Sequence, residues 1–190
     1  MNGKKLTLGF CITGSFCTFG EIIPKLKPLC ESFDIMPIMS FNAYNIDSRF
    51  GKSTDFIDKI EKTTGKKIIH TIEGAEPIGA KGLCDVMIIM PCTGNTAAKL
   101  ALGITDTPVT MAAKGHLRNG RPLVIAISTN DAMAANYKNI AMLQNTKNIY
   151  FVPYRQDDCN KKPTSLIADF TKAEEAIRSA LSGKQLQPLI

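Results

Sequence analysis

The chain has 190 residues and a formal net charge of +6, with 44% hydrophobic and 21% charged residues. This length predicts a single domain over residues 1–190, with residues 183–190 as a C-terminal tail. The composition permits a sizeable core and excludes disordered and collagen-like classes. The basic residues are scattered and not interleaved with aromatics, so we expect no nucleic-acid partner. No apolar run approaches the roughly 20 residues of a membrane span, so we expect no membrane association.

The cysteines and the N-terminal segment provide evidence on metal binding and on the cellular compartment. Six cysteines stand at irregular intervals without a CxxC pair, and only two histidines accompany them, so we expect no metal site. Most of these cysteines lie in apolar runs, which favours buried thiols in a reducing cytoplasm over a disulfide framework. The apolar stretch after Lys4 and Lys5 lacks a cleavage pattern. We therefore expect a cytoplasmic protein.

The first third of the chain alternates between apolar runs and segments of helical periodicity. Residues 6–12 are predicted to form a strand, and residues 22–33 a helix in which Pro24 falls in the first turn. Residues 34–39 predict a second strand, where Pro37 indicates a bend or an edge. A second helix is predicted around residues 56–60.

The rest of the chain continues this alternation. Residues 85–90 and 122–127 predict the central strands, and residues 148–152 predict a shorter one. A last helix is predicted over residues 167–181, ending at Gly183. The pattern predicts an α/β fold with three layers, in which helices cover both faces of a parallel sheet.

Four of the predicted strands run into loops rich in hydroxyl and amide side chains. In open parallel sheets, ligands bind beyond the carboxyl ends of the strands. Such loops, where they open a helix, present N–H and hydroxyl donors that suit a phosphate. Ordinary helix capping explains any one of them, but four at one edge favour a phosphate-bearing cofactor. The candidate cofactor-binding residues are Thr13, Gly14, Ser15, Phe16, Ser40, Asn42, Pro91, Thr93, Gly94, Asn95, Thr96, Ser128, Thr129 and Asn130.

The two common phosphate-binding patterns do not fit these loops. Gly9 and Gly14 have the spacing of a P-loop, but Ser15 stands where lysine is required, and the chain has no GxGxxG. We therefore expect neither ATP nor a nicotinamide dinucleotide held in those ways.

The same loops resemble those of the flavin-dependent cysteine-decarboxylase family, and the resemblance covers nearly the whole chain. PCTGNT at residues 91–96 is similar to the family's PASANT-type motif, and STNDAM at residues 128–133 is similar to its PxMNxxM motif. The matching residues are Pro91, Asn95 and Thr96 in the first motif, and Asn130 and Met133 in the second. The resemblance implies a Rossmann-like, flavodoxin-like sheet, an FMN cofactor and a homo-oligomer of trimers or multiples of trimers.

The chain departs from this family at the catalytic base. The decarboxylases have a histidine, followed by isoleucine, eight residues before the aspartate that opens the PASANT strand. Counting back from Asp85 gives Pro77 and Ile78, so that base is absent. Because proline has no ionisable side chain, we do not expect decarboxylation of cysteinyl substrates.

Residues 74–79, 104–132, 146–153 and 183–188 resemble one branch of the family. That branch comprises the B subunits of two-subunit enzymes that make pyridine-2,6-dicarboxylate (dipicolinate) in spore-forming bacteria. The resemblance implies an A subunit that carries NAD(P), and a small anionic dicarboxylate substrate of the dihydrodipicolinate type. It also implies the mother-cell cytoplasm of a sporulating bacterium. Two alternatives stay open: a scaffold subunit of flavin fold without redox chemistry, and an FMN-dependent decarboxylase-like enzyme.

A dicarboxylate substrate needs cationic or N–H partners. Lys114 and Arg118 are the candidate substrate-binding residues, although a solvated helix end gives the same residues. His70 and His116 are the two histidines and could move a proton, but a structural or surface role explains each of them better. Cys92 could be activated at a strand end or simply pack. No catalytic residue is assigned from the sequence.

Residues 41–51 form a long predicted connection that contains Tyr44, Arg49 and Phe50. Aromatic residues beside arginine are typical of interfaces. This segment therefore also indicates self-association.

Overall fold

The computed structural model describes residues 5–190. Within this range, seven strands form one sheet in the order β2-β1-β3-β4-β7-β6, and β5 pairs with β4 beside that path. The strands are β1 (Thr7–Ile12), β2 (Asp34–Met39), β3 (Val86–Cys92), β4 (Leu123–Thr129), β5 (Ile149–Phe151), β6 (Tyr154–Gln156) and β7 (Leu166–Ala168).

Most of the pairing in this sheet is parallel. β1 lies parallel to β2 and β3, and β4 lies parallel to β3 and β5. The end of β4 pairs instead with β7, and β7 with β6, both antiparallel. The α/β fold and the flavodoxin-like arrangement of the sheet are confirmed, but the sheet is mixed, not wholly parallel. The antiparallel strands have three residues each, too few to give a recognisable periodicity.

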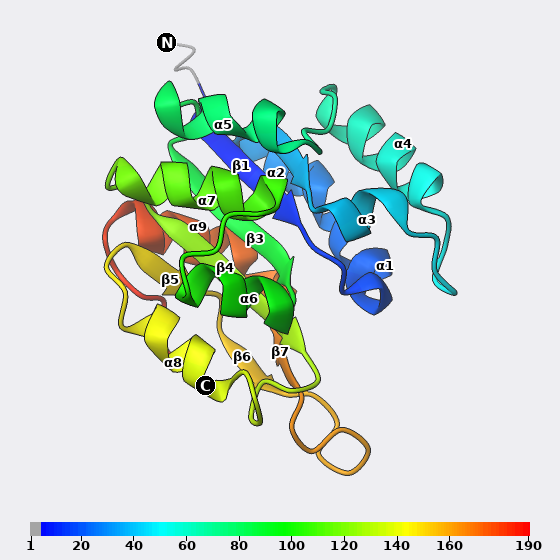
Figure 1. Cartoon of the computed structure of the whole chain (residues 1–190), viewed down its shortest axis with the longest axis vertical. Helices are drawn as coiled ribbons and strands as arrows, with labels where there is room; N and C mark the ends of the chain where they lie inside the picture. The colour runs from blue at the N-terminus through cyan, green and yellow to red at the C-terminus, as the bar shows by residue number, and fades with distance from the viewer. Residues whose placement is uncertain (1–4) are drawn as a thin grey trace.

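Helices cover both faces of the sheet, as Figure 1 shows. α5, α6, α7 and α8 lie on the face toward the viewer, and α2 and α9 lie behind. The Ser32 hydroxyl of α2 donates to the Glu174 carboxylate of α9 at 2.7 Å, which joins the two helices on the rear face. The helices are α1 (Phe19–Ile22), α2 (Leu26–Ser32), α3 (Phe41–Asn45), α4 (Ser53–Thr64), α5 (Ile72–Ala80), α6 (Gly94–Ala101), α7 (Pro108–Arg118), α8 (Tyr137–Gln144) and α9 (Ala173–Leu181). Within residues 5–190, no helix combines the length and apolar character needed to span a membrane.

Three predicted elements differ from the structure. The helix over residues 22–33 is divided, because a 3₁₀ turn with Pro24 (Ile23–Lys25) separates α1 from α2. The last helix begins at Ala173, since Ile167 belongs to β7. The long connection at residues 41–51 instead contains α3 and a turn in which Ser48 and Gly51 exchange backbone hydrogen bonds of 3.0 and 3.1 Å.

The buried central strands and their register decide where the loops of the site lie. Every residue of β3 is buried, and so is all of β4 except Thr129. On the front face, α5 and α7 approach through two glycines: a Cβ on Gly79 would lie 2.4 Å from the Cα of Gly115. Ile12 of β1 is in register with Met39 of β2, and Cys92 of β3 with Ile127 of β4. The loops that follow these strands therefore meet at one edge of the sheet.

Candidate functional site

Two neighbouring cavities lie at the carboxyl edge of the sheet. The Ser40 cavity, of about 400 Å³, is lined by the residues that follow β1, β2 and β3, by α6 and by the residues that precede α7. The Arg49 cavity, of about 540 Å³, is lined by the loops after β1 and β4, by the Arg49–Phe50 turn and by the β6–β7 hairpin. Gly14 and Thr93 line both cavities. Each volume is in the range of small-molecule sites, which runs from about 300 to 1,000 Å³.

The structure brings the predicted cofactor-binding residues together at these cavities. The Ser40 cavity is lined by Gly14, Ser40, Asn42, Thr93, Asn95 and Thr96. The Arg49 cavity is lined by Gly14, Ser15, Phe16, Thr93, Ser128, Thr129 and Asn130. Thr13, Pro91 and Gly94 are buried and do not line either cavity. These three support the cavity walls from behind.

Hydroxyl groups connect the strand ends to one another. Thr13 Oγ1 donates to the Pro91 carbonyl at 2.7 Å and accepts from the Thr93 N–H at 3.0 Å. The Ser15 and Ser128 hydroxyls lie 2.9 Å apart, so the loop after β1 is also joined to the end of β4. These bonds hold the walls of both cavities in place before any ligand binds.

Helix starts supply further donors at this edge. The Thr93 hydroxyl caps α6 by accepting from the Thr96 N–H at 3.2 Å. The first N–H groups of an α-helix have no partner within the helix and carry partial positive charge. Ser40 caps the short helix α3 in the same way, accepting from the Ala43 N–H at 3.3 Å. The Ser40 cavity therefore combines hydroxyl, amide and backbone donors.

Gly94 is required by a close approach between two loops. A Cβ at this position would lie 2.5 Å from Nδ2 of Asn136 and 2.7 Å from Oδ1 of Asp131. The Asp131 carboxylate accepts from the Thr129 hydroxyl and from the Asn136 amide, both at 2.6 Å. This network presses the loop after β4 against the start of α6, so Gly94 acts through packing.

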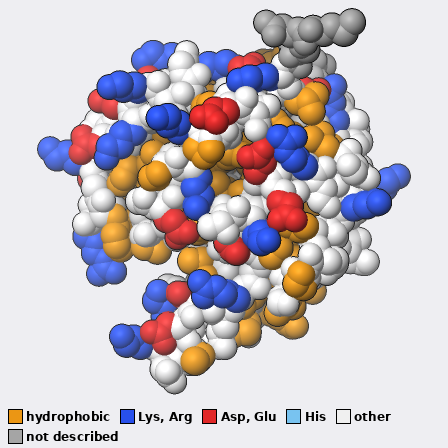
Figure 2. Space-filling view, turned by 180° about the vertical axis from the view of Figure 1, so that it is seen from behind, with side chains coloured by type: hydrophobic (Ala, Val, Ile, Leu, Met, Phe, Trp, Pro, Cys, Tyr) orange, Lys and Arg blue, Asp and Glu red, His pale blue; other side chains and the backbone are white. Residues whose placement is uncertain are grey.

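The charges around the two cavities are mixed. In the Ser40 cavity, the Lys99 ammonium is held by the Asp106 carboxylate at 2.8 Å. In the Arg49 cavity, Lys162 pairs with Asp157 at 2.8 Å, while Arg49 and Glu21 form no ion pair within residues 5–190. Lys and Arg side chains are interspersed with Asp and Glu on the rear face as well, as Figure 2 shows.

The structure does not bring Lys114 and Arg118 to this edge. Both lie in α7, whose last turn precedes the start of β4, and neither lines either cavity. The neighbouring His116 Nε2–H donates to the Pro122 carbonyl, just before β4, at 2.9 Å. Helices that connect parallel strands run antiparallel to them, so the end of α7 lies at the opposite edge of the sheet. Within a single copy of the chain, the predicted substrate-binding residues Lys114 and Arg118 are therefore separated from the predicted cofactor-binding residues, and their role stays a prediction.

The remaining candidate groups lie outside the cavities. Burial lowers the pKa of His116 below its ordinary value, so this side chain is neutral near pH 7. The His70 ring stacks on Tyr44 with centroids 3.8 Å apart and does not line a cavity. Cys92 is fully buried in the core, and this burial raises the pKa of its thiol to about 12. Pro77 lies inside α5, where the decarboxylase base is expected.

Several residues that line the cavities were not among the ligand-binding candidates, and Arg49 and Lys162 are two of them. The sequence indicated Arg49 only as part of an interface, and Lys162 only as one of the scattered basic residues. Their place at the cavity depends on the turn at residues 48–51 and on the β6–β7 hairpin, and no local spacing predicts either contact. Within residues 5–190, no group of three or more His, Cys, Asp or Glu side chains is arranged to hold a metal ion.

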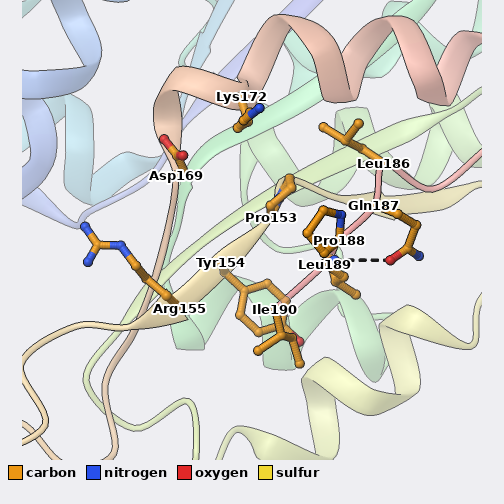
Figure 3. A pocket seen from close by; sticks show the side chains of 10 residues that line it. All are labelled: Pro153, Tyr154, Arg155, Asp169, Lys172, Leu186, Gln187, Pro188, Leu189 and Ile190. Carbon is orange, nitrogen blue, oxygen red and sulfur yellow. Dashed lines mark hydrogen bonds between the residues drawn. The ribbon is translucent and has the colours of Figure 1, made fainter.

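A third cavity, of about 320 Å³, lies at the C-terminal tail (Figure 3). Its apolar wall is formed by Tyr154 and by residues 186–190, while Arg155 points away from that wall. The tail is held by the Tyr154 N–H, which donates to the Leu189 carbonyl at 3.0 Å. This cavity shares no lining residue with the Ser40 cavity or the Arg49 cavity.

A family profile and several known proteins match the sequence and the fold of this chain. The profile of the family described as Flavoprotein matches residues 1–179. The B subunit of dipicolinate synthase from Bacillus subtilis (strain 168) is 44% identical over 100% of this chain and 94% of its own length. The crystal structure of the corresponding B subunit from Bacillus halodurans C has a TM-score of 0.89 and 43% identity, covering 100% of this chain and 97% of that one. The FMN-dependent cysteine decarboxylase SpaF shares the fold, with a TM-score of 0.66 and 22% identity, over 94% of this chain and 97% of its own.

Proposed function

Because the chain belongs to the flavoprotein family and, within it, to the dipicolinate synthase B subunits, we propose that it binds FMN and works with a separate NAD(P)-dependent A subunit. Together the two subunits oxidise a dihydrodipicolinate-type intermediate to pyridine-2,6-dicarboxylate. The observation that carries this proposal is the 44% identity to the B. subtilis protein over the whole chain. We place the reaction in the mother-cell cytoplasm of a sporulating bacterium, as the relationship to that protein suggests.

The donors at the carboxyl edge fit a flavin mononucleotide. Ser40, Asn42, Asn95 and Thr96, with the loop at Gly14, would hold the phosphate and the ribityl chain. Among residues 5–190, the only carboxylate that lines this cavity is Asp106, which Lys99 neutralises at 2.8 Å, so it does not repel a phosphate strongly. Hydrogen bonds from such donors to a charged phosphate contribute about 1.5–3 kcal/mol each.

The loops after β1 and β4 would border the flavin ring on the side of the Arg49 cavity. When bound, a flavin supplies the capacity to accept a hydride. In the Arg49 cavity, the side chains of Phe16 and Phe50 would exclude water. The hydroxyls of Ser15, Ser128 and Thr129 and the amide of Asn130 would orient the polar groups of the substrate. Formation of the aromatic product removes two electrons and two protons, and the gain in aromaticity favours that step.

Decarboxylation of cysteinyl substrates has less support. Pro77 stands where the decarboxylase histidine is expected, and neither His70 nor His116 lines a cavity. A proton-accepting base must lie within hydrogen-bond reach of its substrate. We therefore assign the chain to the oxidation and not to decarboxylation.

We also propose that the chain forms a homo-oligomer of trimers or multiples of trimers. Phe41, Ile46 and Phe50 expose 38%, 44% and 47% of their surface, and all three lie within ten residues around α3. Clustered exposed apolar side chains of this kind mark interaction surfaces. The segment borders both cavities, through Phe41 on one side and Phe50 on the other, so self-association would enclose the cofactor edge.

Spectroscopy of the purified chain tests the flavin part of this proposal. The chain is mixed with FMN and dialysed, and its visible spectrum and flavin fluorescence are compared with those of free FMN. We expect retained flavin with quenched fluorescence. Complete loss of flavin on dialysis, with unchanged fluorescence during titration, would contradict FMN binding and favour the scaffold alternative.

A further inference from the structure

The Arg49 cavity has a chemical character that differs from the Ser40 cavity. Two aromatic rings, Phe16 and Phe50, line it together with the hydroxyls of Ser15 and Ser128. Such a surface suits a flat molecule with polar groups at its rim better than a phosphate. The cavity adjoins the loops proposed to border the flavin.

In the part of the chain that the structure describes, four charged side chains line this cavity, and their pairing leaves one cation available. Lys162 is bound to the Asp157 carboxylate at 2.8 Å, and the Ser165 hydroxyl donates to the same carboxylate at 3.4 Å. Arg49 has no carboxylate within ion-pair distance among residues 5–190. Glu21 is the remaining charged side chain, and it is exposed at the rim.

The turn that carries Arg49 is built rigidly. Ser48 and Gly51 exchange backbone hydrogen bonds of 3.0 and 3.1 Å, and the Phe50 N–H donates to the Ser48 hydroxyl at 3.2 Å. The Asp47 carboxylate accepts from the Ser53 N–H at 2.8 Å and so ties the turn to the start of α4. Gly51 has a φ of +146°, and a Cβ there would lie 2.7 Å from the Phe56 ring. The position of the Arg49 backbone is therefore fixed before a ligand arrives.

The guanidinium of Arg49 lies over the Phe50 ring, 4.9 Å from its centroid. Stacking on an aromatic face occupies the plane of the guanidinium and leaves its N–H donors free at the edge. A guanidinium edge matches a carboxylate, which accepts two parallel hydrogen bonds from it. A lysine in this place could make only point contacts.

We propose that Arg49 binds one carboxylate of the substrate in this cavity, and that Ser15, Ser128 and Asn130 face the opposite end of the substrate. The substrate class is a small planar dicarboxylate, and this assignment rests on the proposed function. Lys162 contributes less than Arg49 to binding of the carboxylate, because its charge is already balanced by Asp157. Glu21 opposes the binding of a dianion through like-charge repulsion.

Calorimetric titration with pyridine-2,6-dicarboxylate tests this assignment without any enzyme turnover. The full chain is titrated with and without FMN, in metal-free buffer because this probe chelates metals. We expect Arg49→Ala to weaken binding of the dicarboxylate by tenfold or more and Arg49→Lys to restore part of it. We expect Glu21→Gln to strengthen binding by a few-fold. FMN affinity, followed by flavin fluorescence, should change less than twofold in all three variants.

Arg118→Ala is the matched control, because Arg118 is also exposed but lies at the opposite edge of the sheet. Its dicarboxylate affinity should equal that of the wild-type chain. Wild-type affinity in Arg49→Ala, or loss of affinity in Arg118→Ala alone, would overturn the role of Arg49 and leave FMN binding unaffected. Failure of the wild-type chain to bind FMN would instead count against the proposed function. The titrations without FMN would still test whether Arg49 binds the dicarboxylate. A wild-type chain that binds no dicarboxylate in either state would also overturn the assignment.

Discussion

The Thr13 hydroxyl accepts a hydrogen bond from the backbone N–H of Thr93 at 3.0 Å, across the ends of two neighbouring strands. Thr13 is 1% exposed, and its hydroxyl also donates to the Pro91 carbonyl at 2.7 Å. One side chain therefore satisfies two backbone groups, one at the end of β3 and one just beyond it. It also sets the separation between the loops that line the two cavities.

Replacing Thr13 by valine should loosen this edge. The shape of the side chain is kept, but two backbone groups lose their partner, which costs about 1–3 kcal/mol of unfolding free energy. Urea unfolding measures the change, and flavin fluorescence should show weaker FMN binding. Thr13→Ser is the control, since it keeps the hydroxyl and should lose about 1 kcal/mol or less. Equal stability of Thr13→Val and the wild-type chain would contradict this role.

Ser40 provides a test of the phosphate position. Loss of a hydrogen bond to a charged phosphate costs about 1.5–3 kcal/mol, so Ser40→Ala should weaken FMN binding by about tenfold or more. The variant also loses the cap of α3. Thr71→Ala is matched to it, because the Thr71 hydroxyl caps α5 by accepting from the Gly74 N–H at 3.1 Å and lines neither cavity. Fluorescence titration should show normal FMN affinity for Thr71→Ala, and unchanged affinity for Ser40→Ala would remove Ser40 from the site.

The contact between Gly79 and Gly115 predicts a strong effect on stability. A Cβ on Gly79 would lie 2.4 Å from the Cα of Gly115, so Gly79→Ala should lower the unfolding free energy by about 1–3 kcal/mol through overpacking of α5 against α7. Gly20 in α1 has no atom within 4 Å of such a Cβ, and Gly20→Ala should be neutral or stabilising by up to about 1 kcal/mol. Thermal unfolding of the two variants distinguishes them. Equal melting temperatures would show that the helix contact relaxes at no cost.

His116 predicts a dependence of stability on pH. Burial lowers its pKa in the folded chain, so below about pH 6.5 the unfolded chain binds a proton that the folded chain does not. The free energy of unfolding should therefore fall as the pH drops through this window, by at most about 1.4 kcal/mol per pH unit, and level off below the folded pKa. His116→Gln should remove this component, which urea unfolding at pH 7.5 and 5.5 measures. An identical pH dependence in the variant would contradict it.

The sequence predicts the central strands well because burial on both faces leaves a continuous apolar signal. β3 and β4 were predicted within two residues at each end, and the loops that follow them were correctly placed at one edge. The rule that located the loops also explains why Lys114 and Arg118, the predicted substrate-binding residues, lie away from them. A segment that leads into a parallel strand lies at the opposite edge from the loop that leaves it.

The hairpin and the Arg49 turn could not be predicted for a different reason. β6 and β7 have three residues each, and the pairing that joins the hairpin to the sheet connects β7 with the end of β4, which is distant in the sequence. The place of Arg49 depends on the Ser48–Gly51 turn and on how α4 packs, not on any spacing within the segment. The charged lining of the Arg49 cavity can therefore be recognised only in the folded structure.

The measurement that tests the central claim most directly is the synthesis of pyridine-2,6-dicarboxylate by reconstituted subunits. The purified chain with FMN and the proposed A subunit are mixed with an enzymatically generated dihydrodipicolinate precursor and a nicotinamide cofactor. The ultraviolet absorbance of the aromatic product is then followed over time. We predict full activity only when both subunits are present, and little or none with either alone. Full activity from the A subunit without this chain would contradict the account.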